Sequence, residues 1–169
     1  MEMESESGQR NWVEWLGRHG AMLLLFARTQ TRCAADAEDI VQETLAELSR
    51  KHPAQPPGLP AAYITLRRRA IDLGRTMDRR QAREQASLLD APTVYWFENT
   101  LERDERSRLI DAAMKRMPQK HREVVVLKLW GDLTFAEIAQ TLAVPINTAA
   151  SRYRYGLEFL KQHAPLSHL

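Results

Sequence analysis

The sequence predicts an all-α protein of two small helical domains, residues 9–83 and 99–163, joined by a short linker at residues 84–98. Two observations predict this fold class. Apolar residues recur every three or four positions through most of the chain, which is the period of a helix with one buried face, and this period is lost in the linker. No stretch alternates convincingly as a strand would. The best candidate, VVVLKLW, lies between Pro118 and Gly131, where its surroundings favour a helix.

The composition is typical of a soluble globular protein. Hydrophobic residues make up 44% of the 169 residues and charged residues 27%. No apolar run approaches the roughly 20 residues that are needed to span a bilayer. The first ten residues are acidic and polar, unlike a secretory signal. We therefore expect a cytoplasmic protein without membrane insertion. The net charge of +2 does not by itself predict nucleic-acid binding.

Residues that carry catalytic or metal chemistry are sparse. Cys33 is the single cysteine, and no zinc-type spacing links it to the five histidines. The chain has no Gly-rich phosphate loop. A metal-dependent nuclease using Asp36, Glu38 and Asp39 lacks a supporting His or Lys arrangement. We therefore expect a binding protein with no enzymatic activity, metal, cofactor or small-molecule substrate.

The first domain should begin with two helices. One runs from residue 11 to about 29, and Asp36 is expected to cap the next, from residue 37 to about 51. Five acids and no Lys or Arg lie between residues 34 and 49. Such a run is typical of a solvated helix face. Three residues share the outward side of this acidic helix: Asp39, Gln42 and Glu43.

The third helix is predicted to be basic. Residues 52–60, HPAQPPGLP, form a loop stiffened by four prolines, and Pro60 suits the first position of the helix that follows. Between residues 67 and 83, seven arginines oppose Asp72 and Asp78. This density favours an electrostatic footprint for a phosphate backbone, although arginine-rich runs also occur in interaction tails.

The C-terminal domain contains a predicted helix-turn-helix. Its first helices run from residue 99 or 100 to about 116 and from Pro118 to Gly131. Thr134 and Glu137 form a capping box that starts the next helix. Pro145 stops that helix, and Asn147 is expected to cap a last one beginning at Thr148. An ordinary helical hairpin with a basic face is the alternative. Five outward side chains suit base edges and phosphates: Thr148, Ser151, Arg152, Arg154 and Tyr155.

Three motifs in this order resemble the short, two-domain bacterial RNA polymerase sigma factors called the extracytoplasmic-function group. DAEDIVQETLAEL, residues 36–48, is similar to the acidic region that docks on core polymerase in that family. RRRAIDLGR, residues 67–75, is similar to the segment that reads and opens the minus-ten element. Residues 117–161 are similar to the region whose helix-turn-helix binds the minus-thirty-five element.

The resemblance implies a function and its residues. The chain would bind core RNA polymerase, direct it to promoter DNA and help open the strands. The resemblance does not decide whether the chain also binds an anti-sigma factor. Core binding would fall to Asp39, Gln42 and Glu43, and loop 52–59 would hold an extruded base. The minus-ten contacts would be Tyr63, Arg67, Arg68 and Arg75; the minus-thirty-five contacts would be Thr148, Ser151, Arg152, Arg154 and Tyr155.

Two departures from the family pattern bear on DNA binding, the first on base preference at the minus-ten element and the second on one phosphate contact of the recognition helix. Tyr63 and three successive arginines stand in the minus-ten helix where Trp and Asn are frequent. Asn147 and Ala150 stand in the recognition helix where Gly and a basic residue are frequent. The alternative function is a stand-alone helix-turn-helix regulator that binds its operator without polymerase. The acidic motif favours the sigma factor, because a stand-alone regulator has no use for a polymerase-docking surface.

Overall fold

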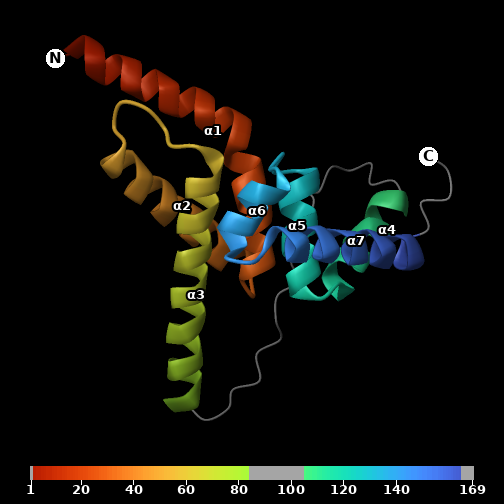
Figure 1. Cartoon of the computed structure of the whole chain (residues 1–169). Coiled ribbons are helices and arrows are strands. Elements are labelled where there is room, and N and C mark those ends of the chain that lie inside the picture. Colours follow the sequence, from red (N-terminus) through yellow and green to blue (C-terminus); the bar gives the residue numbers. More distant parts are fainter. Residues whose placement is uncertain (1, 84–104, 165–169) are drawn as a thin grey trace. The chain divides into compact units, whose positions relative to one another are not determined.

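The computed structural model describes residues 2–83 and 105–164, and each of these two ranges belongs to its own compact unit. All regular elements in these ranges are helices, so the all-α prediction is confirmed. The predicted linker at 84–98 and the helix start at residue 99 or 100 lie outside the described residues. Figure 1 shows the helices α1 (Glu2–Gln30), α2 (Ala34–Lys51), α3 (Leu59–Arg83), α4 (Glu105–Arg116), α5 (Gln119–Leu129), α6 (Phe135–Leu142) and α7 (Ile146–His163).

The first unit is a three-helix bundle in which α1, α2 and α3 each pack against the other two. Its core is built from the apolar stripes that helical spacing predicts. Burial of these side chains is the main favourable term for the unit, because each removes apolar area from water. The largest fully buried side chains of this core are Tyr63, Phe26, Leu23 and Leu66.

Helix α1 extends further toward the N-terminus than the sequence predicts, and the loop between α2 and α3 packs against its first half (Figure 1). The indole Nε1 of Trp12 donates to the His52 carbonyl oxygen at 2.9 Å, and Asn11 donates to the Ala54 carbonyl at 3.1 Å. Gly8 permits this approach, since a Cβ there would lie 2.6 Å from the Pro53 carbonyl oxygen. The loop is thereby fixed to the helix.

The start of α2 differs from the expected cap. The helix begins at Ala34, and Cys33 is its N-cap, with Sγ accepting a hydrogen bond from the Asp36 amide at 3.4 Å. Asp36 was therefore wrongly predicted as the cap. It lies in the first turn, where its negative charge is favourable next to the positive end of the helix dipole.

The second unit is organised around α5, which is buried on most sides and packs against α6 and α7. Val124, Val125, Val126 and Leu127 are at most 1% exposed, so the run that could have been a strand is a core helix. Helix α7 crosses α5 at Gly156, where an added Cβ would overlap the Val125 side chain. The absence of a side chain at position 156 therefore sets how closely the two helices approach.

The helix-turn-helix is present, with one corrected boundary. Both halves of the predicted capping box at α6 form: the Thr134 hydroxyl accepts from the Glu137 amide at 3.3 Å, and Glu137 accepts from the Thr134 amide at 2.8 Å. Ala143 then adopts a left-handed conformation with φ 54° and ends the helix.

Helix α7 begins at Ile146, not at Thr148. Pro145 lies at the N-cap position with an extended ψ of 148°, and its carbonyl oxygen accepts from the Ala149 amide at 3.0 Å. Asn147 therefore lies within the first turn of the helix, and its prediction as the cap was wrong. Pro145 therefore opens α7 two residues after Ala143 has ended α6.

Candidate functional site

The acidic side of α2 borders a groove between α2 and α3. Asp39, Gln42 and Glu43 are all exposed on α2, as helical spacing predicts. Asp39 and Glu43 lie in the groove, whose volume is 290 Å³, whereas Gln42 does not line it. Four of the groove's eight lining residues are acids, so a positively charged side chain is the complementary occupant. The lining residues are Asp36, Asp39, Ile40, Glu43, Arg69, Asp72, Leu73 and Thr76.

Ion pairs join the acidic helix α2 to the arginine-rich helix α3. Arg69 donates to Glu43 at 2.6 Å and to Glu47 at 2.6 Å, and Arg68 donates to both carboxylate oxygens of Glu47 at 2.7 and 2.9 Å. Lys51 adds a further bond to Glu47 at 2.6 Å. These donors lower the pKa of Glu47 to about 2, with Lys51 and Arg68 the largest contributors. Sequence reasoning did not single out Glu47, although it lies one turn after Glu43.

The predicted minus-ten arginines are in three different environments. Arg67 is half-buried. Arg68 is exposed but is paired with Glu47, as described above. Arg75 is also exposed, and the nearest approach of its guanidinium to the Asp72 carboxylate is a loose 3.9 Å. Ile64 and Ile71 are 37% and 38% exposed, so the same helix presents aliphatic as well as cationic side chains to solvent.

Tyr63 is not on the surface, which corrects its assignment as a DNA contact. Its side chain is 1% exposed and packs edge-on against Phe26. Burial raises the pKa of its hydroxyl to about 12. The large apolar ring is part of the core, and its helical spacing from Leu66, which is also buried, could have indicated this role.

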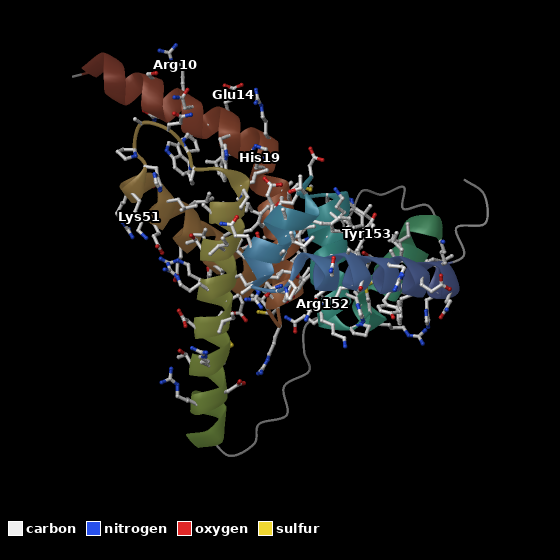
Figure 2. All side chains as sticks on the ribbon, in the orientation of Figure 1. Arg10, Glu14, His19, Lys51, Arg152 and Tyr153 are labelled. Carbon is white, nitrogen blue, oxygen red and sulfur yellow. The ribbon has the colours of Figure 1, made fainter. Side chains whose placement is uncertain are left out.

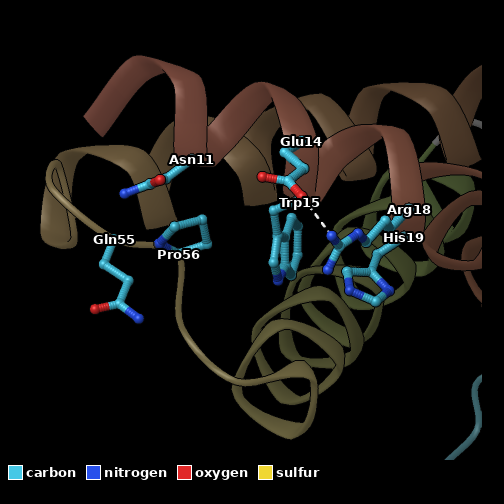
Figure 3. Close-up of a pocket in the computed structure, with 7 residues that line it drawn as sticks. All are labelled: Asn11, Glu14, Trp15, Arg18, His19, Gln55 and Pro56. Atoms are coloured by element: carbon cyan, nitrogen blue, oxygen red, sulfur yellow. Dashed lines mark hydrogen bonds and ion pairs between the residues drawn. The ribbon is translucent and has the colours of Figure 1, made fainter. Parts of the chain in front are cut away.

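The loop between α2 and α3 forms a small pocket with α1. Its volume is 230 Å³. Figure 3 shows the Trp15 indole between Pro56 on one side and Arg18 with His19 on the other. The Trp15 and His19 rings are in edge contact, and burial followed by the positive charge of Arg18 lowers the pKa of His19. Arg18 is paired with Glu14. The pocket therefore combines aromatic faces with polar groups, including Asn11 and Gln55.

Four of the five residues predicted on the recognition helix line a hollow at the N-terminal half of α7. Thr148, Ser151, Arg152 and Tyr155 line this hollow, whose volume is 430 Å³. Arg152 projects from α7 in Figure 2, with Tyr153 beside it in the sequence. Tyr153 contacts Phe135 of α6, so it helps to hold the two helices together. Arg154 does not line the hollow, but its guanidinium lies 5.4 Å from the centre of the Tyr155 ring.

Asn147 and two residues of α5 complete this hollow, and the sequence reasoning missed the two residues of α5. Lys120 and His121 belong to a different helix, and only the crossing of α5 and α7 brings them to the same surface. His121 Nδ1 donates to the Arg152 carbonyl oxygen at 3.2 Å. Burial lowers the pKa of His121, and the charges of Lys120 and Arg152 lower it further, against the hydrogen bond, which raises it.

Among the helices of residues 2–83 and 105–164, none combines the length and the apolar character that a membrane span requires. The same residues contain no group of three or more His, Cys, Asp or Glu side chains placed to hold a metal ion.

Known proteins resemble the chain in sequence and in fold. Residues 107–160 match the family model for Sigma-70, region 4. The chain is 30% identical over 139 residues to the ECF RNA polymerase sigma factor RpoE of Cereibacter sphaeroides, across 77% of this chain and 73% of that protein. It is 29% identical over 132 residues to the ECF RNA polymerase sigma factor SigK of Mycobacterium sp. (strain KMS), across 74% and 68% of the two chains.

A solved structure shares the fold. The sigma factor RpoE from Bartonella quintana, in complex with the anti-sigma factor NepR, matches with a TM-score of 0.70 at 17% identity. The match covers 86% of this chain and 91% of that one.

Proposed function

Because the chain belongs to the extracytoplasmic-function group of RNA polymerase sigma factors, we propose that its two units divide the contacts of such a factor between core polymerase and the two promoter elements. The chain binds core RNA polymerase and directs it to promoter DNA to initiate transcription. The observation that carries the proposal is the segregation of charge: acids gather on α2, arginines on α3, and a polar and basic face on α7. Each face is complementary to a different partner.

Core polymerase is bound by the acidic side of α2, through Asp39, Gln42 and Glu43. Their exposure and their place beside an acidic groove support this role, because charged partners steer each other into register. Lys or Arg side chains on the partner surface complement the negative charge of the groove.

The minus-ten element is bound by α3 and the neighbouring loop. Arg67, Arg68 and Arg75 contact phosphates there, while the loop pocket beside Trp15 holds an extruded base. An aromatic face with nearby amide groups suits a flipped base, which is stacked and hydrogen-bonded once it leaves the duplex. Tyr63 has no direct part in these contacts, because it is core.

The minus-thirty-five element is bound by the N-terminal half of α7. Thr148, Ser151, Arg152 and Tyr155 approach the bases and the backbone, and Arg154 contacts a phosphate on the flank. Lys120 adds a cation from α5 to the same surface. Helix-turn-helix proteins read the major groove with this part of the second helix.

The remaining expectations follow from this role. The chain acts by binding, with no catalytic chemistry of its own, and it works in the cytoplasm, where polymerase and chromosome meet. An anti-sigma factor is a candidate regulator, because the structurally similar RpoE of Bartonella quintana was solved in complex with one.

Co-purification with core polymerase tests the proposal. Glu43→Lys reverses one charge on the acidic side of α2, so it should weaken association with core and reduce run-off transcription from a responsive promoter in proportion. Glu158→Lys makes the same charge change at an exposed position of α7 and should leave core association unchanged. Normal core binding by Glu43→Lys would overturn the assignment of α2. Promoter binding by the free chain as tight as that of the holoenzyme would favour the stand-alone regulator.

A further inference from the structure

Arg69 differs from its neighbours on the arginine-rich helix. Its side chain is 25% exposed, whereas that of Arg68 is 55% exposed and that of Arg75 is 72% exposed. Its three guanidinium nitrogens are all engaged with acids of α2. Nη1 donates to Glu43 at 2.6 Å, Nη2 donates to Glu47 at 2.6 Å, and Nε donates to Glu47 at 3.1 Å. These bonds use three of the five guanidinium N–H donors, and two carboxylates already neutralise the charge, so a phosphate gains less from Arg69 than from an unpaired arginine.

The geometry points to a positioning role: we infer that Arg69 orients Glu43 for contact with core polymerase and does not bind promoter DNA. This inference rests on the proposed role of Glu43 in core binding. The guanidinium is a rigid planar fork, so anchoring two of its nitrogens on Glu47 fixes the direction in which the third points. That third nitrogen holds the Glu43 carboxylate.

The anchor is itself held firmly. Glu47 is only 12% exposed and also accepts from Lys51 and Arg68. Glu43, in contrast, is 64% exposed, so it stays available to a partner while Arg69 restrains it. An exposed glutamate samples several rotamers, and ordering it before binding removes part of the entropy cost of the interface. Arg69 also lines the acidic groove together with Asp39 and Glu43.

A double-mutant cycle on the full-length chain tests this inference. The affinity for core polymerase is measured for the wild type, Arg69→Met, Glu43→Gln and the double variant. Arg69→Met removes the fork but keeps an unbranched side chain, and we expect it to weaken core binding roughly fivefold to tenfold. In the Glu43→Gln background the same change should have a much smaller effect, because Arg69 acts through Glu43. Arg69→Lys keeps the positive charge but lacks the planar fork that fixes the direction of the donor toward Glu43, so it should recover part of the affinity.

The salt dependence of promoter binding separates positioning from DNA contact. Holoenzyme assembled at saturating concentration with Arg69→Met should bind promoter DNA with an unchanged salt slope. Arg75→Ala is the matched control, and it should reduce the slope by about one without changing core affinity.

Three results would overturn the inference. They are additive effects of Arg69→Met and Glu43→Gln on core affinity, an unchanged core affinity in Arg69→Met, and a reduced salt slope in that variant. If Glu43→Gln leaves core affinity intact while Arg69→Met lowers it, Arg69 acts by another route, and the proposed role of Glu43 fails separately. If Arg69→Met does not fold by circular dichroism, Arg69→Lys takes its place in the cycle with the same criterion of non-additivity.

Discussion

Tyr63 of α3 packs edge-on against Phe26 of α1, with ring centroids 5.2 Å apart and an interplanar angle of 83°. This pair joins two helices of the first unit at the centre of its core, since Phe26 is fully buried and Tyr63 is 1% exposed. Edge-to-face aromatic pairs are favourable beyond the area that they bury. The residue that the family resemblance placed among the DNA contacts is therefore a core residue in this chain.

The Tyr63 pair predicts how two substitutions should differ. Tyr63→Ala should lower the free energy of unfolding by about 3–5 kcal/mol, because it leaves a cavity between α1 and α3. Tyr63→Phe keeps the ring contact and should retain strand opening at the minus-ten element. Urea unfolding and permanganate reactivity of the promoter measure the two effects. Loss of opening in a well-folded Tyr63→Phe protein would show that the hydroxyl contacts DNA after all.

Glu47 predicts an acid-sensitive stability of the first unit. Hydrogen bonds from Lys51, Arg68 and Arg69 lower its pKa from 4.5 to about 2 in the folded chain. Its contribution to stability is therefore complete above pH 4.5 and is lost as the pH falls from there toward about 2. Urea unfolding between pH 6 and pH 2 should show this loss, and Glu47→Gln should remove that part of the pH dependence.

A partner of Glu47 provides the control for this experiment. Lys51→Met removes one donor and should give a pH dependence between those of the wild type and Glu47→Gln. An unchanged acid dependence in Glu47→Gln would mean that other carboxylates dominate the titration.

Gly156 predicts a steric limit in the second unit. Gly156→Ala would place a methyl group against the buried Val125 side chain, so we expect a loss of about 1–3 kcal/mol in the free energy of unfolding. Gly74→Ala is the control, because a Cβ at that position of α3 meets no atom within 4 Å. Gly74→Ala should therefore raise the free energy of unfolding of the first unit by about 0.5–1 kcal/mol, because alanine is favoured over glycine inside a helix. Equal effects of the two changes would contradict the close crossing of α5 and α7.

Lys120 predicts a phosphate contact contributed by α5. Lys120→Ala should weaken binding of the holoenzyme to a promoter fragment. It should also reduce the slope of log affinity against log salt concentration by about one, because fewer counterions are released when one phosphate contact is lost. Lys161→Ala removes the same charge from the last turn of α7, far along the helix from the hollow, and should leave the slope unchanged. Equal slopes for the two variants would exclude Lys120 from the interface.

Much of the fold was predictable because its signals are local. Helical periodicity, the capping box at Thr134 and the prolines that interrupt helices each depend on residues a few positions apart. The family was also predictable, because the order of the three motifs is a property of the linear chain. Two caps were predicted at the wrong residue, Asp36 and Asn147. In both cases the helix starts slightly earlier, because a backbone or sulfur acceptor upstream, at Pro145 or Cys33, takes the first hydrogen bonds.

The sequence by itself determined which face of each helix carries acids, arginines or apolar residues, since that follows from the 3.6-residue turn alone. Only the tertiary structure decided what each of these side chains meets. It paired Arg69 with Glu43 and Glu47, placed Tyr63 on Phe26, and brought Lys120 and His121 beside the recognition helix. The physical reason is that these partners lie on different helices. Which helices face each other is decided by packing of the core, and a long side chain takes the conformation that contacts the helix opposite it.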